Sequence, residues 1–244
     1  MVEDRIDEKT DATRSRVEPY INFIKRAETT GPRLGVFASS FNPPTIAHVE
    51  LIRRATQTFA LDETIALAGK ANADKVEYEC SFDDRIEMLK LAFADDRHTS
   101  IGVSSHAFYV DMVDALEHVY SRQTNLHFIV GFDTFERVLD PENRYTARYY
   151  RTFNDRVEAL EYLFARASFI VAGRGGTRLE SVRLLTERER ALPSERIFYL
   201  DFPADLGELS ATEVRNRQRS GQSTTGLVPE AVERYLREQR LYLS

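Results

Sequence analysis

Short apolar runs alternate with amphipathic stretches along most of the chain, and this pattern predicts strands separated by helices. Strands spaced in this way form βαβ units, whose parallel strands are buried on both faces. The expected fold is therefore α/β: a Rossmann-like, doubly wound, mostly parallel sheet of five to six strands with helices on both faces. The runs expected to be strands are residues 34–40 (LGVFASS), 64–69 (TIALAG), 100–105 (SIGVSS), 126–133 (LHFIVGFD), 168–174 (SFIVAGR) and 196–202 (RIFYLDF).

The segments between these runs carry helical periodicity and helix-start residues. The first strand leads into NPPTIAHVELIRRATQTF, which reads as a turn followed by a helix. Ser81 is expected to cap the next helix, because Asp84 follows three residues later in an acidic variant of the capping box. Further helices are expected at 110–120, 149–166 and 178–190, and from Ser210 and Pro229.

The first thirty residues differ from the rest of the chain. Residues 1–16 are charged and almost free of large apolar side chains, so we expect a mobile tail. Residues 17–28 (VEPYINFIKRAE) are expected to form a short helix packed on the outside, and Gly31-Pro32 then breaks the chain. The expected organisation is a tail and short helix over 1–30, followed by a single domain over 31–244.

Composition narrows the class of protein. The 244 residues include 33 Lys+Arg and 39 Asp+Glu, a formal net charge of −6, with one cysteine and no tryptophan. A lone Cys80 excludes a disulfide-stapled fold and is expected to be an inert thiol. The chain has no apolar run long enough to span a membrane and no secretory signal, so a cytoplasmic location is expected. The acidic balance argues against a nucleic-acid partner, and the scattered histidines argue against a protein-bound metal site.

The first candidate site is the joint between the first strand and its helix, FASSFNPPTIAH (37–48). Ligands of doubly wound sheets bind beyond the carboxyl ends of strands, where helix N-termini favour anions. Thr45 and His48 are three residues apart, so in a first helical turn they share a face and could hold a phosphate. The alternative is that Thr45 only caps the helix and His48 has a structural role.

The second candidate site is LSATEVRNRQR (209–219), at the start of another helix. Ser210 and Glu213 have the spacing of a capping box, which is a purely structural explanation. Thr212 and Arg215 again share a face, and Arg217 and Arg219 make this stretch cationic within an acidic chain. These residues favour a second phosphate-binding helix start.

Together the two joints resemble the nucleotidylyltransferase superfamily. FNPPTIAH is similar to its nucleotide-binding signature F-[ND]-P-x-[HT]-x-x-H, and SATEVR is similar to its second signature, S-[SA]-T-x-x-R. The closing segment GLVPEAVERYLREQRLY resembles the family's last turn, helix and tyrosine. The order, the spacing and the chain length resemble the nicotinamide/nicotinate mononucleotide adenylyltransferases.

This resemblance implies transfer of an adenylyl group from ATP to the phosphate of nicotinamide or nicotinate mononucleotide, with release of pyrophosphate. Mg²⁺ is expected to bridge the ATP phosphates, and the partners are ATP and a small phosphorylated acceptor, with a homo-oligomer left open. The implied catalytic residues are Thr45, His48 and Arg215. The implied nucleotide-binding residues are Ser39, Ser40, Phe41, Asn42, Asp133, Arg174, Ser210 and Thr212. The implied acceptor-binding residues are Lys75, Phe132 and Phe135.

The sequence also departs from the common form of the family. Thr45 stands where a histidine is common, Ala47 replaces a glycine, and no tryptophan is present to stack on a pyridine ring. Recognition of the acceptor, amide against acid, and ATP against CTP therefore stay open. The alternatives are a cytidylyltransferase-like or other nucleotidylyltransferase with a different phosphorylated acceptor, or a nucleotide-binding regulator without turnover.

Overall fold

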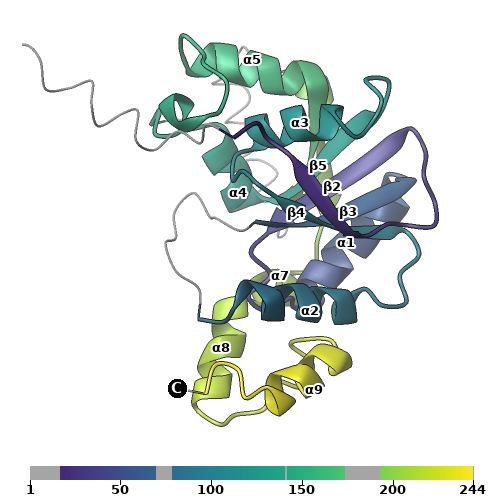
Figure 1. Ribbon diagram of the computed structural model, residues 1–244, viewed down its shortest axis with the longest axis vertical. Helices are drawn as coiled ribbons and strands as arrows, with labels where there is room; N and C mark the ends of the chain where they lie inside the picture. Colours follow the sequence, from purple (N-terminus) through teal and green to yellow (C-terminus); the bar gives the residue numbers. More distant parts are fainter. Residues whose placement is uncertain (1–16, 70–78, 141, 174–192, 244) are drawn as a thin grey trace, which may run out of the picture.

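The structure is a computed structural model that describes residues 17–69, 79–140, 142–173 and 193–243 (Figure 1). Its seven strands form one sheet in the order β1-β4-β3-β2-β5-β6-β7. All neighbours are parallel except β1, which pairs antiparallel with β4. The strands are β1 (Ile21–Lys25), β2 (Arg33–Ser39), β3 (Glu63–Gly69), β4 (Thr99–Ser104), β5 (Asn125–Gly131), β6 (Ala167–Gly173) and β7 (Ile197–Asp201).

Helices cover both faces of this sheet (Figure 1). One face carries α3 (Tyr109–Glu117), α4 (Phe132–Val138) and α5 (Arg156–Arg166). The other carries α1 (Ile46–Thr58), α2 (Phe82–Ala92) and α7 (Ala204–Glu208), and beyond α2 lie α8 (Ala211–Arg219) and α9 (Glu230–Glu238). Two 3-10 turns, Thr146–Arg148 and Ser194–Arg196, complete the described elements.

Two hydrophobic cores lie on opposite faces of the sheet because successive strand side chains alternate. In β3, Ile65 and Leu67 enter the core under α3 and α5, whereas Ala66 and Ala68 enter the core under α1 and α2. A third cluster, which includes Met88, Val214, Val232, Leu236 and Tyr242, fastens α8 and α9 to the outer side of α2. The doubly wound, mostly parallel fold expected from the sequence is confirmed.

The six expected strands are all present, and the seventh corrects one prediction. Residues 17–28 were expected to form a helix, but Ile21–Lys25 is the edge strand β1. Its exposure alternates along INFIK, with Ile21 buried and Asn22 exposed, as in a strand with one covered face. Pairing with β4, from Ile21 opposite Ser104, outweighs the helical tendency of a short charged segment.

Helix α5 is shorter than expected. It begins at Arg156 rather than near Tyr149, because Asp155 caps it by accepting a hydrogen bond from the Glu158 amide. The preceding residues turn back toward α3, where the Tyr150 amide donates to Asp111 Oδ1 at 2.8 Å. The expected tail over 1–16 and the expected helix over 178–190 lie outside the described residues.

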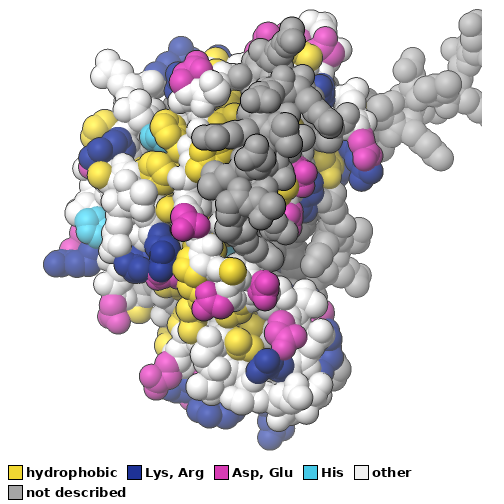
Figure 2. Space-filling model, turned by 180° about the vertical axis from the view of Figure 1, so that it is seen from behind, with side chains coloured by type: hydrophobic (Ala, Val, Ile, Leu, Met, Phe, Trp, Pro, Cys, Tyr) yellow, Lys and Arg dark blue, Asp and Glu magenta, His cyan; other side chains and the backbone are white. Residues whose placement is uncertain are grey.

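On the face drawn in Figure 2, basic and acidic side chains are interspersed outside the grey region, with no extended patch of one sign. None of the described helices is both long enough and apolar enough to cross a membrane.

Candidate active site

The two strands that begin the halves of the sheet, β2 and β5, lie side by side at its centre. From β2 the chain moves outward through β3 and β4, and from β5 it moves the other way through β6 and β7. The crevice beyond the carboxyl ends of such a pair is the usual ligand site of a doubly wound sheet. Residues 39–48 lead from the end of β2 into α1, and residues 131–133 lead from the end of β5 into α4, so these two joints lie side by side.

Thr45 and His48 form a complete capping box at the start of α1. The Thr45 amide donates to His48 Nδ1 at 2.9 Å, and the His48 amide donates to Thr45 Oγ1 at 3.4 Å. Thr45 is only 1% exposed, and its hydroxyl lies 3.1 Å from Nδ1. Thr45 therefore caps α1, and its side chain orients the His48 ring.

The environment of His48 fixes its charge and its tautomer. Burial of the ring, which lies against Phe37 and Phe41, lowers the pKa of His48 from 6.5 to about 4. The imidazole is therefore neutral near pH 7. Because Nδ1 accepts the Thr45 amide proton, the ring proton is on Nε2, which leaves Nε2–H as the donor of this side chain.

The start of α1 offers fewer open amides than the sequence suggested. The Ile46 amide donates to the Leu227 carbonyl at 3.0 Å, and the Thr45 and His48 amides are used by the capping box. Among the described residues, this leaves the Ala47 amide of the first turn without an acceptor. The closing segment of the chain thus contributes directly to the first helix start.

Arg215 joins the two motifs by bonding to Asn42, which lies 173 residues earlier in the chain. Its Nη1 donates to the Asn42 carbonyl at 2.7 Å, and its Nη2 donates to Thr212 Oγ1 at 3.1 Å. Nε pairs with Glu79 at 3.0 Å, and Arg215 is 7% exposed. Arg215 therefore holds the turn after β2 against the start of α8. It also brings a positive charge to this place.

Glu79 is the acidic partner of this cationic region. Burial raises its pKa, but hydrogen bonds and charge from Arg219 and Arg215 outweigh that effect and hold the pKa below its ordinary value. The carboxylate is ionised near neutral pH and partly offsets the two guanidiniums.

Arg85 is a site residue that the sequence reasoning missed. It is 2% exposed, and its Nη1 donates to the carbonyls of Ser40 at 2.8 Å and of Gly69 at 3.3 Å. These carbonyls follow β2 and end β3, so Arg85 ties two neighbouring strand ends together. The signal was present in α2, where Arg85 shares the buried stripe of Met88 and Leu89 at spacings of three and four.

The start of α8 has more open amides than the start of α1. Ser210 caps it by accepting from the Glu213 amide at 3.2 Å, but Glu213 pairs with Arg217 instead of returning to Ser210, so only half of the expected capping box forms. Among the described residues, the amides of Ala211 and Thr212 have no acceptor. Free amides at a helix N-terminus suit an anion.

The remaining expected residues that the structure describes lie at or after the carboxyl ends of β2 and β5. Ser39 and Ser40 are half-buried in the turn, and Phe41, with φ +46°, is fully buried. Asp133 is exposed in the first turn of α4, and the preceding Phe132 is half-buried. Phe135 is 0% exposed and packs on Phe169, so its ring is not open to a ligand. Lys75 and Arg174 lie outside the described residues.

The donors near the crevice do not form a metal cage. In the ranges that the structure describes, no three His, Cys, Asp or Glu side chains form a group that could hold a metal ion. We therefore name no protein ligand for Mg²⁺.

Comparisons with known proteins bear on the family and the fold of the chain. A family model described as cytidylyltransferase-like matches residues 36–217. The chain is 29% identical over 233 residues to a probable nicotinate-nucleotide adenylyltransferase of Geobacter sulfurreducens, covering 86% of this chain and 98% of the relative. One of Citrifermentans bemidjiense is 27% identical over 232 residues, with the same coverage. A Plasmodium falciparum nicotinic acid mononucleotide adenylyltransferase complexed with NaAD shares the fold, at TM-score 0.64 and 14% identity over 87% of this chain and 98% of that one.

Proposed function

The chain belongs to the cytidylyltransferase-like family, and from that premise we propose that it transfers an adenylyl group from ATP to the phosphate of nicotinate mononucleotide. The observation that carries this proposal is the 2.7 Å hydrogen bond from Arg215 to the Asn42 carbonyl. It holds two phosphate-binding motifs together at the switch point of the sheet, where one triphosphate could contact both. The names of the most similar curated relatives favour the acid over the amide of the pyridine nucleotide.

The reaction needs positioning and charge stabilisation more than proton transfer. An oxygen of the acceptor phosphate attacks the α-phosphorus of ATP and forms the new P–O bond. The bond from the α-phosphorus to the α,β-bridging oxygen breaks, and its electron pair leaves with pyrophosphate. The acceptor phosphate is already anionic near neutral pH, so no general base is required.

His48 is placed to act as a neutral hydrogen-bond donor. Its Nε2–H would donate to a phosphate oxygen as negative charge develops on the leaving group, while Thr45 holds the ring from the other side. The open amides of Ala211 and Thr212 would bind the β- and γ-phosphates, next to the positive charge of Arg215. In this assignment Thr45 is a positioning residue, and His48 touches the substrate.

The other end of each nucleotide is assigned to the turn after β5. The Asp133 carboxylate would accept hydrogen bonds from ribose hydroxyls. Phe132 would stack on the pyridine ring, a role that the buried Phe135 cannot fill. Mg²⁺ would be carried by the phosphates themselves and would neutralise their charge, a role that requires few protein ligands.

The test is pyrophosphate release with a panel of substrates. ATP is offered with nicotinate mononucleotide, nicotinamide mononucleotide or phosphopantetheine, and CTP replaces ATP in a parallel series. The proposal requires the highest kcat/KM with ATP and nicotinate mononucleotide. A preference for another acceptor or for CTP would identify a different nucleotidylyltransferase. ATP binding without turnover on any acceptor would identify a nucleotide-binding regulator.

A further inference from the structure

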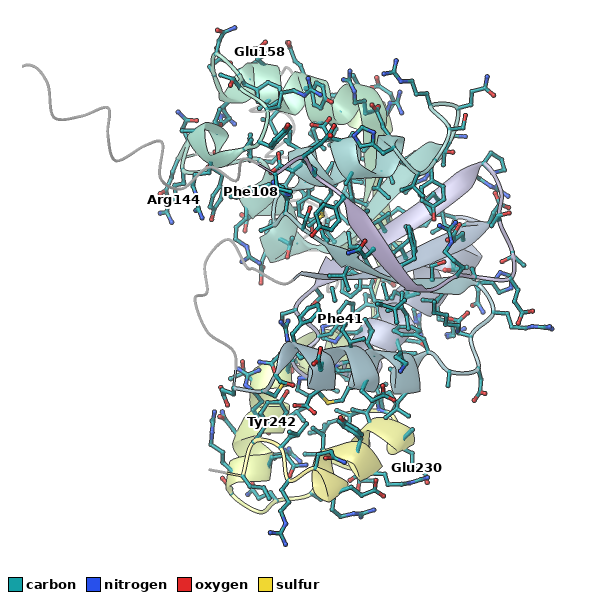
Figure 3. All side chains as sticks on the ribbon, in the orientation of Figure 1. Phe41, Phe108, Arg144, Glu158, Glu230 and Tyr242 are labelled. Atoms are coloured by element: carbon teal, nitrogen blue, oxygen red, sulfur yellow. The ribbon has the colours of Figure 1, made fainter. Side chains whose placement is uncertain are left out.

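Tyr242, which follows α9, reaches back to the turn that follows β2. Its hydroxyl donates to Asn42 Oδ1 at 2.6 Å, across 200 residues of sequence. The Cys80 thiol donates to the same oxygen at 3.0 Å and lies 3.0 Å from the Tyr242 hydroxyl. Figure 3 shows Tyr242 on the side of the sheet that carries α2 and α8. The three side chains form a small polar cluster between the third hydrophobic cluster and the charged side chain of Arg215.

This cluster fixes the orientation of the Asn42 amide. Asn42 is 4% exposed, and both acceptor positions of Oδ1 are occupied, one by Tyr242 and one by Cys80. The amide nitrogen therefore occupies the opposite side of the group. Within the described residues, Nδ2 has no hydrogen-bond acceptor.

The ring and the hydroxyl of Tyr242 have separate roles. The ring packs in the third cluster with Met88, Val232 and Leu236, a role that phenylalanine could fill. In the part of the chain that the structure describes, the hydroxyl has only Asn42 and Cys80 as partners. The backbone of Tyr242 is in the left-handed region, with φ +62°, which is unfavourable for an aromatic residue. This unfavourable conformation occurs at the residue whose hydroxyl bonds to Asn42 in the turn after β2.

Protonation states agree with these donor roles. Burial raises the pKa of the Cys80 thiol, which therefore stays protonated and can donate. Burial also raises the pKa of the Tyr242 hydroxyl above its ordinary value. Both groups are donors throughout the neutral range.

We propose that Tyr242 is a positioning residue that holds Asn42 Oδ1 so that Nδ2 donates to a phosphate of the bound nucleotide. The inference rests on the proposed function, because it assumes that a phosphate chain occupies the crevice beside Asn42. It assigns to the closing segment of the chain a role in substrate binding, in addition to its packing against α2.

The test is Tyr242→Phe, which removes the hydroxyl and keeps the ring. The matched control is Tyr235→Phe. Tyr235 lies on α9, packs against the same cluster, and donates its hydroxyl to Asp84 Oδ1 at 2.9 Å without reaching Asn42. We expect Tyr242→Phe to lower kcat/KM for ATP by about three- to tenfold, the effect of one neutral hydrogen bond, and Tyr235→Phe to leave it unchanged. Equal effects of the two variants, at equal melting temperatures, would overturn the proposal.

A double-mutant cycle shows whether Tyr242 acts through Asn42. In an Asn42→Ala background, Tyr242→Phe should have no further effect on the dissociation constant of a non-hydrolysable ATP analogue, measured by calorimetry. An undiminished effect in that background would contradict the proposed route. Because this readout is binding, it applies even if the wild-type chain turns over none of the acceptors, an outcome that would refute only the proposed function.

Discussion

Replacing His48 separates its two roles, because glutamine and alanine differ in what they keep. His48 is the third residue of α1 and accepts the Thr45 amide proton at Nδ1, while its Nε2–H is the proposed donor to phosphate. Glutamine at this position is an ordinary capping-box partner and can accept the same amide proton. It cannot present a second N–H donor rigidly where Nε2 lies. Alanine removes both functions.

The structure gives different magnitudes for stability and for activity. His48→Gln should change the free energy of unfolding by less than about 0.5 kcal/mol, because the cap is kept. His48→Ala leaves the Thr45 amide without its partner in a buried position, which costs about 1–3 kcal/mol and lowers the melting temperature by about 2–4 °C per kcal/mol. Both variants should lose about 2.7–4 kcal/mol of transition-state stabilisation, a fall of about 100- to 1,000-fold in kcat/KM.

The assay pairs pyrophosphate release under steady-state conditions with denaturant unfolding of the same preparations. The expected result is a glutamine variant with near-wild-type stability and strongly reduced turnover. A fall of less than about threefold in kcat/KM for a folded His48→Gln would refute the donor role and leave His48 as a capping residue only.

Other predictions concern pH, the link between motifs, the second helix start and the acceptor. Folding lowers the pKa of His48 from 6.5 to about 4. At pH values between these two, the unfolded chain therefore binds a proton at His48 that the folded chain does not. Stability from this residue should be lost as pH falls from about 6.5 to about 4, and His48→Gln should show a shallower loss in denaturant titrations across that range. Arg215→Met should cost about 1.5–3 kcal/mol of unfolding free energy, because the buried Asn42 carbonyl loses a charge-assisted hydrogen bond. The same variant should weaken ATP binding. Unchanged stability would refute the role of Arg215 in joining the two motifs. Ser210→Ala should cost about 1 kcal/mol of stability in thermal unfolding, and Ser210→Gly only a few tenths of a kcal/mol. If the α8 amides hold the phosphates, the glycine variant should keep the ATP affinity of the wild type, measured by calorimetry. Phe132→Leu should raise KM for the acceptor and leave KM for ATP unchanged; an equal rise in both would contradict the stacking assignment.

The sheet could be predicted from the sequence because its central strands are buried on both faces. Runs such as TIALAG contain little besides apolar residues, and β3 follows this run to within one residue. The edge strand β1 has one covered face and only five residues, so INFIK carries too little pattern to separate a strand from a helix. Its conformation depends on β4, a partner that lies about 80 residues further along.

The candidate site was predictable in its residues and less so in their contacts. Thr45, His48, Ser210 and Arg215 could be singled out because they occupy helix starts after turns. The spacing of residues along the sequence does not predict the tertiary contacts that decide their roles. Neither the Leu227 carbonyl that occupies the Ile46 amide nor the position of Arg85 behind Ser40 follows from periodicity, because both depend on how distant elements pack.

The contact between Tyr242 and Asn42 also has a consequence during synthesis of the protein. A ribosome adds about 5–20 residues per second, so the turn after β2 is made roughly 10–40 s before the residue that orients its amide. During this interval the strands can pair and both cores can close, while the turn after β2 still lacks its contact with Tyr242. A nascent chain would therefore acquire its fold before it acquires its full affinity for nucleotide.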